Sequence, residues 1–331
     1  MPSGMTSRLT RADFEAARLR IADVVRRTPC DHSPTLSERC GVPVWLKLEH
    51  HQHTGAFKLR GAANAVAQLD GAAGLTTAST GNHGRALAYA ARRQGLRAVI
   101  CMSRLVPENK LAAIRALGAE ARIVGASQDE AHEEAVRLVD EEGLAMVPPF
   151  DDLRVIAGQG TLGLEMIEDL PDAETVLIPL SGGGLLAGVA GAMKALRPTL
   201  RVIGVSMERG AAMAASLDAG KPVPVEELPT LADSLGGGVG LDNRYTLAMV
   251  RDLADEIVLV SEAEIADGIR HCYRQECQIV EGAAAVGVAA LLAGKVEARG
   301  PTIVLLSGGN IDMALHARIV AGDSPDLMQE A

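Results

Sequence analysis

The chain has 331 residues, a hydrophobic fraction of 48% and a formal net charge of −10. This length and apolar content suffice for a sizeable core divided between two lobes. The negative charge argues against a protein that binds the phosphate backbone of nucleic acids. The 5 cysteines include no C-x-x-C pair, so neither a disulfide framework nor a zinc site is predicted. No secretion signal or membrane-spanning run is evident, and we expect a cytoplasmic protein without membrane contact.

Short apolar runs rich in β-branched residues alternate with longer alanine-rich segments along the chain. Phe14, Ala17 and Ile21 recur at helical spacing, which predicts an amphipathic helix near the start. Ser261 and Glu264 form a capping box that predicts the beginning of a later helix. The apolar runs predict strands over residues 44–48, 98–102, 121–124, 176–180, 201–206, 257–260 and 302–306. Helices are expected between them, including residues 85–94, 162–169 and 186–196.

Alternating strands and helices predict an α/β fold of largely parallel sheets with helices on both faces. Ligands of such sheets bind at the carboxyl ends of the strands. Three glycine-rich loops fall at such ends: STGNHG at 79–84, SGGGL at 181–185 and SGGN at 307–310. The second loop joins a strand to a helix, where free backbone N–H groups and the helix dipole favour an anion. An ordinary glycine-rich turn is the alternative for that loop taken alone.

Lys58 lies ahead of these loops in the segment EHHQHTGAFKLRG. Most lysines are solvated surface charges. Here Phe57 and small residues flank the amine, and Gly55 and Gly61 permit a sharp turn or a close approach. A lysine shielded from water has a lowered pKa, so its neutral amine can form a Schiff base. Because pyridoxal phosphate commonly uses such a lysine, we predict a lysine-bound phosphate cofactor.

The motifs together resemble one enzyme family. They are E-x-x-Q-x-T-G-A-F-K-x-R-G-A around Lys58, followed by S-T-G-N-H, A-G-Q-G-T, G-G-G-L and S-G-G-N. This series resembles the pyridoxal-phosphate serine/threonine dehydratase and serine racemase family of fold type II, from Glu49 to Asn310. Within it, Thr80 and Arg85 make the chain most similar to the hydroxyectoine utilization dehydratases, beside the catabolic threonine dehydratases.

The resemblance implies a fold like that of the tryptophan synthase β subunit, with two open, twisted parallel-sheet lobes flanked by helices. The large, cofactor-binding lobe would comprise residues 1–70 and 152–331, and the small lobe residues 71–151. Pyridoxal 5′-phosphate would lie in the cleft between them. A homodimer or a larger homo-oligomer is implied as well. The chain leaves no room for the regulatory domain of biosynthetic threonine dehydratases.

The resemblance also implies a role for individual residues. Lys58 and Thr80 would be catalytic, and the Ser307 hydroxyl would face the pyridine nitrogen of the cofactor. A neutral hydroxyl makes the ring a weaker electron sink than an aspartate would, which favours prompt loss of a β-leaving group. The implied cofactor-binding residues are Phe57, Lys58, Asn82, Ser181, Gly182, Gly183, Gly184, Leu185, Glu281 and Ser307. The implied substrate-binding residues are Ser79, Thr80, Gly81, Asn82, His83, Arg85 and Gln159.

Several of these residues have a structural alternative. Ser307 could cap the next helix, and His83 could be a loop histidine bonded to the backbone. Glu281 could occupy a helix entry near the positive end of the dipole. Arg85 could reach an anionic substrate tail or be a solvated first-turn arginine. Thr80 replaces the serine of serine racemases, which argues against efficient racemization.

We expect no metal site. Metal-dependent relatives use a glutamate and an aspartate six positions later, but here Glu208 is followed by Ala214 at that position. In an extended segment, His51 and His53 would share one face whereas His50 would point away. Further ligands for these histidines are lacking in the sequence.

The expected activity is pyridoxal-phosphate-dependent elimination of water from a β-hydroxy-L-amino acid. Lys58 would remove the α-proton, and the products would be a 2-oxo acid and ammonia. The substrate would resemble threonine or serine, or be a hydroxy diamino acid derived from hydroxyectoine. Racemization or β-replacement with the same cofactor is the alternative. A non-catalytic binding protein would need the glycine loops but not Lys58 and Ser307, which disfavours it.

Overall fold

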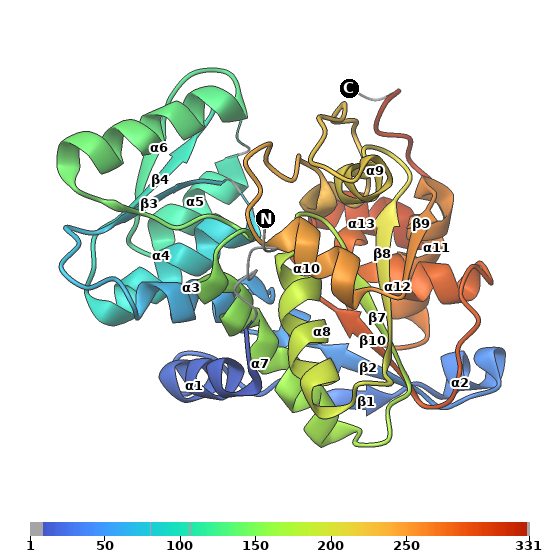
Figure 1. Cartoon of the computed structure of the whole chain (residues 1–331). Coiled ribbons are helices and arrows are strands. Elements are labelled where there is room, and N and C mark those ends of the chain that lie inside the picture. The colour runs from blue at the N-terminus through green and yellow to red at the C-terminus, as the bar shows by residue number, and fades with distance from the viewer. Residues whose placement is uncertain (1–8, 80, 105, 107, 330–331) are drawn as a thin grey trace.

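The computed structural model describes residues 9–79, 81–104, 106 and 108–329. Two sheets organise the described residues (Figure 1): a six-stranded sheet of order β1-β2-β10-β7-β8-β9 and a four-stranded sheet of order β5-β4-β3-β6. Neighbouring strands run parallel in both sheets, except for the antiparallel pair β1 and β2. The predicted α/β fold with two open, largely parallel sheets is therefore confirmed.

The strands match the apolar runs of the sequence. The larger sheet consists of β1 Cys30–His32, β2 Val44–Leu48, β7 Thr175–Pro179, β8 Arg201–Met207, β9 Glu256–Val260 and β10 Thr302–Leu306. The smaller sheet consists of β3 Leu75–Ala78, β4 Ala98–Met102, β5 Glu120–Ile123 and β6 Ala145–Met146. The sequence pattern does not predict β1 and β6, because their 3 and 2 residues are too few to show a period. It implies a strand ahead of the loop at 79, where β3 lies, but gives it no bounds.

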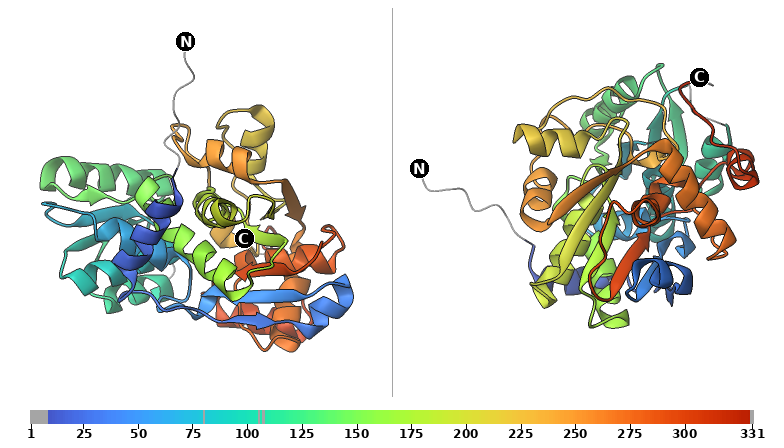
Figure 2. Two further views of the ribbon diagram at one scale, coloured as in Figure 1. Left: turned by 60° about the horizontal axis from the view of Figure 1, so that its bottom comes forward. Right: turned by 90° about the vertical axis from the view of Figure 1, so that its right-hand side faces the viewer.

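Helices cover both faces of the sheets (Figure 2). They are α1 Arg11–Ile21, α2 Pro34–Cys40, α3 Lys58–Val66, α4 Asn82–Gln94, α5 Glu108–Ala116, α6 Gln128–Glu142, α7 Leu153–Asp169, α8 Gly184–Leu196, α9 Ala212–Ala219, α10 Thr246–Leu253, α11 Glu262–Arg274, α12 Gly282–Leu292 and α13 Met313–Ala321, with short 3-10 helices η1 Glu49–His51 and η2 Asp233–Leu235. The predicted capping box at Ser261 is confirmed. Among the described helices, none is both long and apolar enough to cross a membrane.

The larger sheet is buried on both faces, as a continuous apolar strand requires. Along β7, Val176 and Ile178 face the core that α7 and α8 close, whereas Leu177 faces the core that α11 and α12 close. The four-stranded sheet repeats this arrangement with Ile100 on one face and Val99 on the other. Because both faces are covered, the carboxyl edge of each sheet is where the loops can form a site.

Helix α3 carries Lys58 and packs into the core of the smaller sheet through Leu59 and Ala62. All strands of that sheet lie between residues 75 and 146. The lobe boundaries at residues 70 and 151 stay a prediction. The chain segment that bears Lys58 joins β2 of the larger sheet to β3 of the smaller sheet.

Helix α7 differs from its prediction, because it begins at Leu153 and not at residue 162. The glycines of the A-G-Q-G-T motif and Gly163 lie inside the helix, where they permit close contacts with neighbouring helices. A Cβ at Gly158 would lie 2.5 Å from the Arg60 carbonyl oxygen, and one at Gly163 would lie 2.5 Å from the Val189 carbonyl oxygen. Close backbone packing therefore explains these glycines better than a turn does.

Candidate active site

A cavity of about 950 Å³ lies at the carboxyl ends of strands from both sheets. It brings together the loops after β3, β7 and β10, as the strand pattern predicts. Every residue that the resemblance implies for the cofactor lines this cavity: Phe57, Lys58, Asn82, Ser181, Gly182, Gly183, Gly184, Leu185, Glu281 and Ser307. Ser79, Gly81 and His83 line it as well. Their contacts with a ligand stay a prediction.

Lys58 begins α3 and is half-buried at the cavity wall. Its Nζ donates to the Pro149 carbonyl oxygen at 2.8 Å and lies 5.2 Å from the centroid of the Phe57 ring. Burial among protein atoms lowers the pKa of the Lys58 ammonium to about 8, although the Glu281 charge opposes this shift. A substantial fraction of the amine is therefore neutral near pH 8, the state that forms a Schiff base.

The segment before Lys58 is clamped to the loop that carries Ser307. The Phe57 N–H donates to the Ser307 carbonyl oxygen at 2.9 Å, and the Gly309 N–H donates to the Gly55 carbonyl oxygen at 2.9 Å. A β-bridge between Ala56 and Gly308 completes the clamp. This backbone pairing fixes the loop of Ser307 relative to the helix of Lys58.

The loop 181–184 is shaped for an anion. Gly183 has a φ of 88°, a conformation that glycine adopts readily, and caps the amino end of α8. The ring of Phe150 closes one side, since a Cβ at Gly182 would lie 2.5 Å from it. Bare backbone at the positive end of a helix fits the phosphate of pyridoxal phosphate.

Glu281 is buried at the cavity wall, where its carboxylate accepts hydrogen bonds from Asn82 Nδ2 at 2.8 Å and from the Asn310 N–H at 3.1 Å. Burial raises the pKa of Glu281 to about 7, and the nearby Asp233 raises it further, while the two hydrogen bonds and Lys110 lower it. The site therefore contains a carboxyl group that can hold a proton near neutral pH.

His83 is buried beside Lys58 and donates from Nε2 to the Val147 carbonyl oxygen at 2.9 Å. Burial and the Lys58 charge lower the pKa of the imidazole to about 3. The ring is therefore neutral, and its Nδ1 is a buried acceptor that finds no partner within the described part of the chain. The backbone hydrogen bond expected of a loop histidine is present, yet a vacant acceptor lies next to the cavity.

Two residues expected to bind substrate do not line the cavity. Gln159 lies inside α7, where its Oε1 accepts from the Gly61 N–H at 3.1 Å. Arg85 donates to Asn310 Oδ1 at 2.7 Å, so it is neither a solvated arginine nor a cavity residue. Thr80, the other expected catalytic residue, lies outside the described residues.

The prediction that His51 and His53 share one face is wrong. The segment is not extended but coils into η1, which places the His50 and His51 rings 4.3 Å apart. Both Nε2 atoms contact Gln278 Oε1, whereas His53 stacks on Tyr89. Among the described residues, no cluster of three or more His, Cys, Asp or Glu side chains could hold a metal ion.

The sequence did not indicate several cavity residues. The backbone turn at Pro149 and Phe150 supplies the acceptor for Lys58 and the wall behind Gly182. Glu227, Lys110 and Asp233 also line the cavity. No glycine motif marks Pro149, Phe150, Glu227 or Lys110, and the fold alone brings them near the loops. Asp233 precedes a further glycine run that also lines the cavity and that the three predicted loops do not include: Gly236, Gly237, Gly238 and Gly240.

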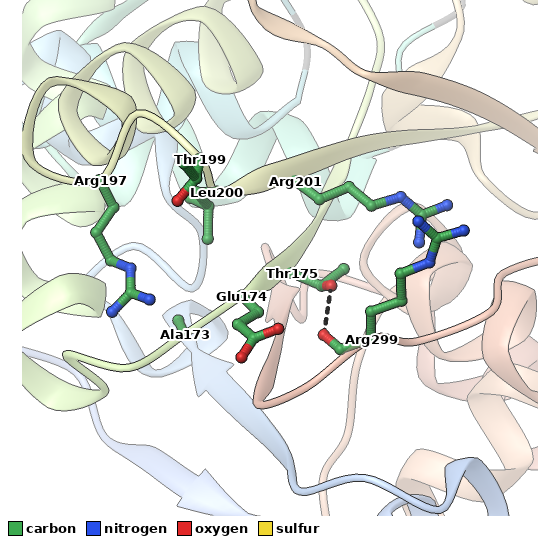
Figure 3. Close-up of a pocket in the computed structure, with 8 residues that line it drawn as sticks. All are labelled: Ala173, Glu174, Thr175, Arg197, Thr199, Leu200, Arg201 and Arg299. Atoms are coloured by element: carbon green, nitrogen blue, oxygen red, sulfur yellow. Dashed lines mark hydrogen bonds between the residues drawn. The ribbon is translucent and has the colours of Figure 1, made fainter.

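A second hollow of about 410 Å³ lies at the opposite, amino-terminal ends of β7 and β8 (Figure 3). Its arginines are engaged by other groups: Arg197 donates to the Pro171 carbonyl oxygen, and Arg201 pairs with Glu256. Arg299 is loosely paired with Glu297 at 3.6 Å. This hollow is separate from the site built around Lys58.

A half-buried lysine in a crevice of two open parallel sheets, facing a glycine-rich anion loop, defines a pyridoxal-phosphate enzyme of fold type II. Comparison with known proteins agrees, since the family model of pyridoxal-phosphate dependent enzymes matches residues 21–308. The chain therefore belongs to that family, and pyridoxal 5′-phosphate is its cofactor.

Three relatives show how close the similarity is. A protein of Sinorhizobium fredii with the provisional name threonine dehydratase is 61% identical, over 96% of each chain. The L-threonine ammonia-lyase of Thermotoga maritima is 43% identical, over 94% of this chain and 78% of its own. The structure of maize serine racemase has a TM-score of 0.89 at 33% identity and covers 93% of this chain and 96% of its own.

Proposed function

We propose that this protein is an ammonia lyase that eliminates water from a β-hydroxy-L-amino acid of the threonine or serine type. The observation that carries the proposal is that one cavity wall contains both Lys58 and Ser307. The pKa of Lys58 is lowered to about 8, and the side chain of Ser307 is a neutral hydroxyl. The names of two relatives support it: the Thermotoga protein is named an L-threonine ammonia-lyase, and the provisional name of the Sinorhizobium protein is threonine dehydratase.

Lys58 is the proposed base. With its pKa lowered to about 8, the neutral amine can take the α-proton of a substrate bound beside it, and the Pro149 carbonyl oxygen holds the resulting ammonium. The bound cofactor supplies the electron sink that this proton transfer requires. Ser307 offers a hydroxyl and no negative charge toward the site, which favours loss of the β-hydroxyl over a long-lived carbanion. The released product then hydrolyses to a 2-oxo acid and ammonia.

The loop before α4 is the proposed carboxylate site. Ser79, Gly81, Asn82 and His83 line the cavity at the amino end of this 13-residue helix. Backbone N–H groups and the helix dipole favour an anion there. A neutral His83 avoids adding a second titrating group beside Lys58.

For the substrate side chain, we propose a cationic group such as the second amine of a hydroxy diamino acid derived from hydroxyectoine. Glu227 and Asp233 contribute two carboxylates to the cavity lining, against one ammonium from Lys110, which pairs with Asp233 at 3.4 Å. This balance favours an ammonium over a second carboxylate in the substrate. Threonine and serine remain the general substrate class.

Racemization is the second candidate, because the chain closely matches the fold of maize serine racemase. That reaction needs an acid or base on the face opposite Lys58, a role for which the resemblance to serine racemases implies Thr80. The hydroxyl of a threonine is more hindered than that of a serine, which favours elimination.

The deciding experiment measures 2-oxo acid release by cofactor-loaded enzyme from L-serine, L-threonine, 3-hydroxyaspartate and 3-hydroxy-2,4-diaminobutyrate. We expect release from at least one, with 3-hydroxyaspartate the poorest. A preference for the diamino acid supports the side-chain proposal, whereas a preference for 3-hydroxyaspartate contradicts it. If no substrate yields a 2-oxo acid while chiral analysis finds D-amino acid, the protein is a racemase.

A further inference from the structure

Arg85 lies in the first turn of α4 and contacts the loop after β10. Its Nη1 donates to Asn310 Oδ1 at 2.7 Å, and its buried Nε has no hydrogen-bond partner among the residues that the structure describes. Burial lowers the pKa of the guanidinium, although the charge of Glu281 opposes the shift. A guanidinium only donates hydrogen bonds. Asn310 must therefore present its amide oxygen to Arg85.

This contact determines the direction of a chain of amides. With its oxygen facing Arg85, Asn310 directs Nδ2 to Asn82 Oδ1 at 2.6 Å and to the Thr54 carbonyl oxygen at 3.0 Å. Asn82 then has only its Nδ2 to offer to Glu281, which accepts at 2.8 Å. A reversed amide at Asn310 would place N–H groups against Arg85 and oxygen against oxygen at Asn82.

The surrounding backbone leaves the Asn310 amide little freedom. Gly55, with a φ of 76°, packs so closely that a Cβ there would lie 2.6 Å from Asn310 Oδ1. The Asn310 N–H donates to the other carboxylate oxygen of Glu281 at 3.1 Å. The chain of amides thus connects α4, the loop before α3 and the loop after β10.

We propose that Arg85 is a positioning residue, which donates to Asn310 and thereby fixes the Asn82 amide and the Glu281 carboxylate at the cavity wall. Asn82 and Glu281 line the cavity, whereas Arg85 does not, so Arg85 acts through them without contacting the substrate. The role rests on the cofactor site and is independent of which amino acid is turned over.

The test follows the visible absorption of the Schiff base between Lys58 and the cofactor as a function of pH, without substrate. Wild type is compared with Arg85→Met, Asn310→Ala and the double variant. Removing the positive charge of Arg85 stabilises protonated groups nearby. The midpoint of the absorption titration is therefore expected at a higher pH in Arg85→Met than in wild type. We expect kcat to fall roughly tenfold to a hundredfold, by the same factor for short and long substrates, because reacting groups are misplaced. The double variant is expected to be no worse than the poorer single variant.

Arg92→Met is the matched control, because Arg92 is an exposed arginine of the same helix. It is expected to leave the absorption titration and kcat unchanged. Melting temperatures confirm that each variant is folded, and Arg85→Gln, which keeps an N–H donor, replaces Arg85→Met if the latter does not fold. A smaller shift in the same direction is then expected.

Three outcomes would overturn the proposal. The first is an Arg85→Met enzyme with unchanged titration and kcat. The second is a rise in KM for charged substrates alone, which would make Arg85 a substrate contact. The third is a double variant whose loss in kcat equals the product of the two single losses, which would show that Arg85 and Asn310 act independently. Because the titration needs no substrate, it decides the matter even if the lyase proposal fails.

Discussion

At the scale of single residues, Lys58 is the group on which the chemistry depends. Its amine is the one that both the lowered pKa and the cavity geometry favour as base. Lys58→Ala is expected to lower kcat by roughly a thousandfold or more, since a general base contributes about 10²–10⁴. It should also abolish the visible Schiff-base absorption. Stopped assays of 2-oxo acid and a spectrum of the loaded protein check both expectations. Lys221→Ala, at an exposed lysine, is the control, and comparable turnover in the two variants would contradict the role of Lys58.

Glu281 predicts a pH dependence of stability in the cofactor-free protein. Burial raises its pKa to about 7 from an ordinary value of 4.5. Because the folded state binds the proton more tightly, the stabilisation is complete below pH 4.5 and is lost as the pH rises to about 7. At 1.36 kcal/mol per pKa unit, the loss is at most roughly 3 kcal/mol.

Urea unfolding at pH 5 and pH 8 measures this effect. Relative to Glu281→Gln, wild type should lose free energy of unfolding between these values. His83 and His50 raise it in both proteins alike, because burial lowers their pKa values to about 3 and about 4 from 6.5. Lys58, whose pKa is lowered to about 8 from 10.5, begins to raise the stability near pH 8, and this effect is present in both proteins and cancels in the comparison. An equal pH dependence in both proteins would show that Glu281 is not buried as a proton-binding group.

At the scale of elements, the packing of α7 against α3 makes a distinct prediction. A Cβ at Gly158 would lie 2.5 Å from the backbone oxygen of Arg60, which cannot rotate away. Gly158→Ala is expected to destabilise the protein by about 1–3 kcal/mol despite the better helix propensity of alanine. Gly191→Ala in α8 is the control, because its Cβ meets the Phe14 ring at 3.1 Å, and a ring can shift. Denaturant titration of both variants checks the difference, and an equally stable Gly158→Ala would refute close backbone packing.

The sequence predicts elements well where a period or a cap marks them. The strand runs and the Ser261 capping box are confirmed because local sequence determines them. The predicted helix start at residue 162 is wrong, since α7 begins at Leu153, and so is the predicted face shared by His51 and His53, since η1 brings His50 beside His51. In both places tertiary packing overrides the local sequence pattern. Glycine motifs and Lys58 mark one wall of the site. Its other wall, at Pro149 and Phe150, carries no motif, since the fold brings backbone atoms there whatever their side chains.

At the scale of the whole molecule, the site connects the two sheets. Asn82 follows a strand of the smaller sheet, whereas Glu281 and Ser307 border the larger one. Buried ion pairs join Arg60 of α3 to Glu49 of η1 and to Glu165 of α7, and they hold α3 at the junction of the two sheets. A cofactor bound at this junction touches groups from both sheets, so its binding energy should stabilise their arrangement as well as the site.

Removing pyridoxal phosphate is therefore expected to lower the melting temperature by several degrees, because a ligand that binds only the folded state stabilises it by RT ln(1 + [L]/Kd). Amide hydrogen exchange should rise in the loops after β3, β7 and β10, which line the cavity, and much less in β2 or β8, which lie in the core. Returning the cofactor to wild type should restore both properties. In Lys58→Ala the phosphate loop is intact, so a smaller recovery is expected. Equal melting temperatures with and without cofactor would mean that contacts within the protein, such as the ion pairs of Arg60, hold the two sheets together. The cofactor would then occupy a junction that is already rigid without it.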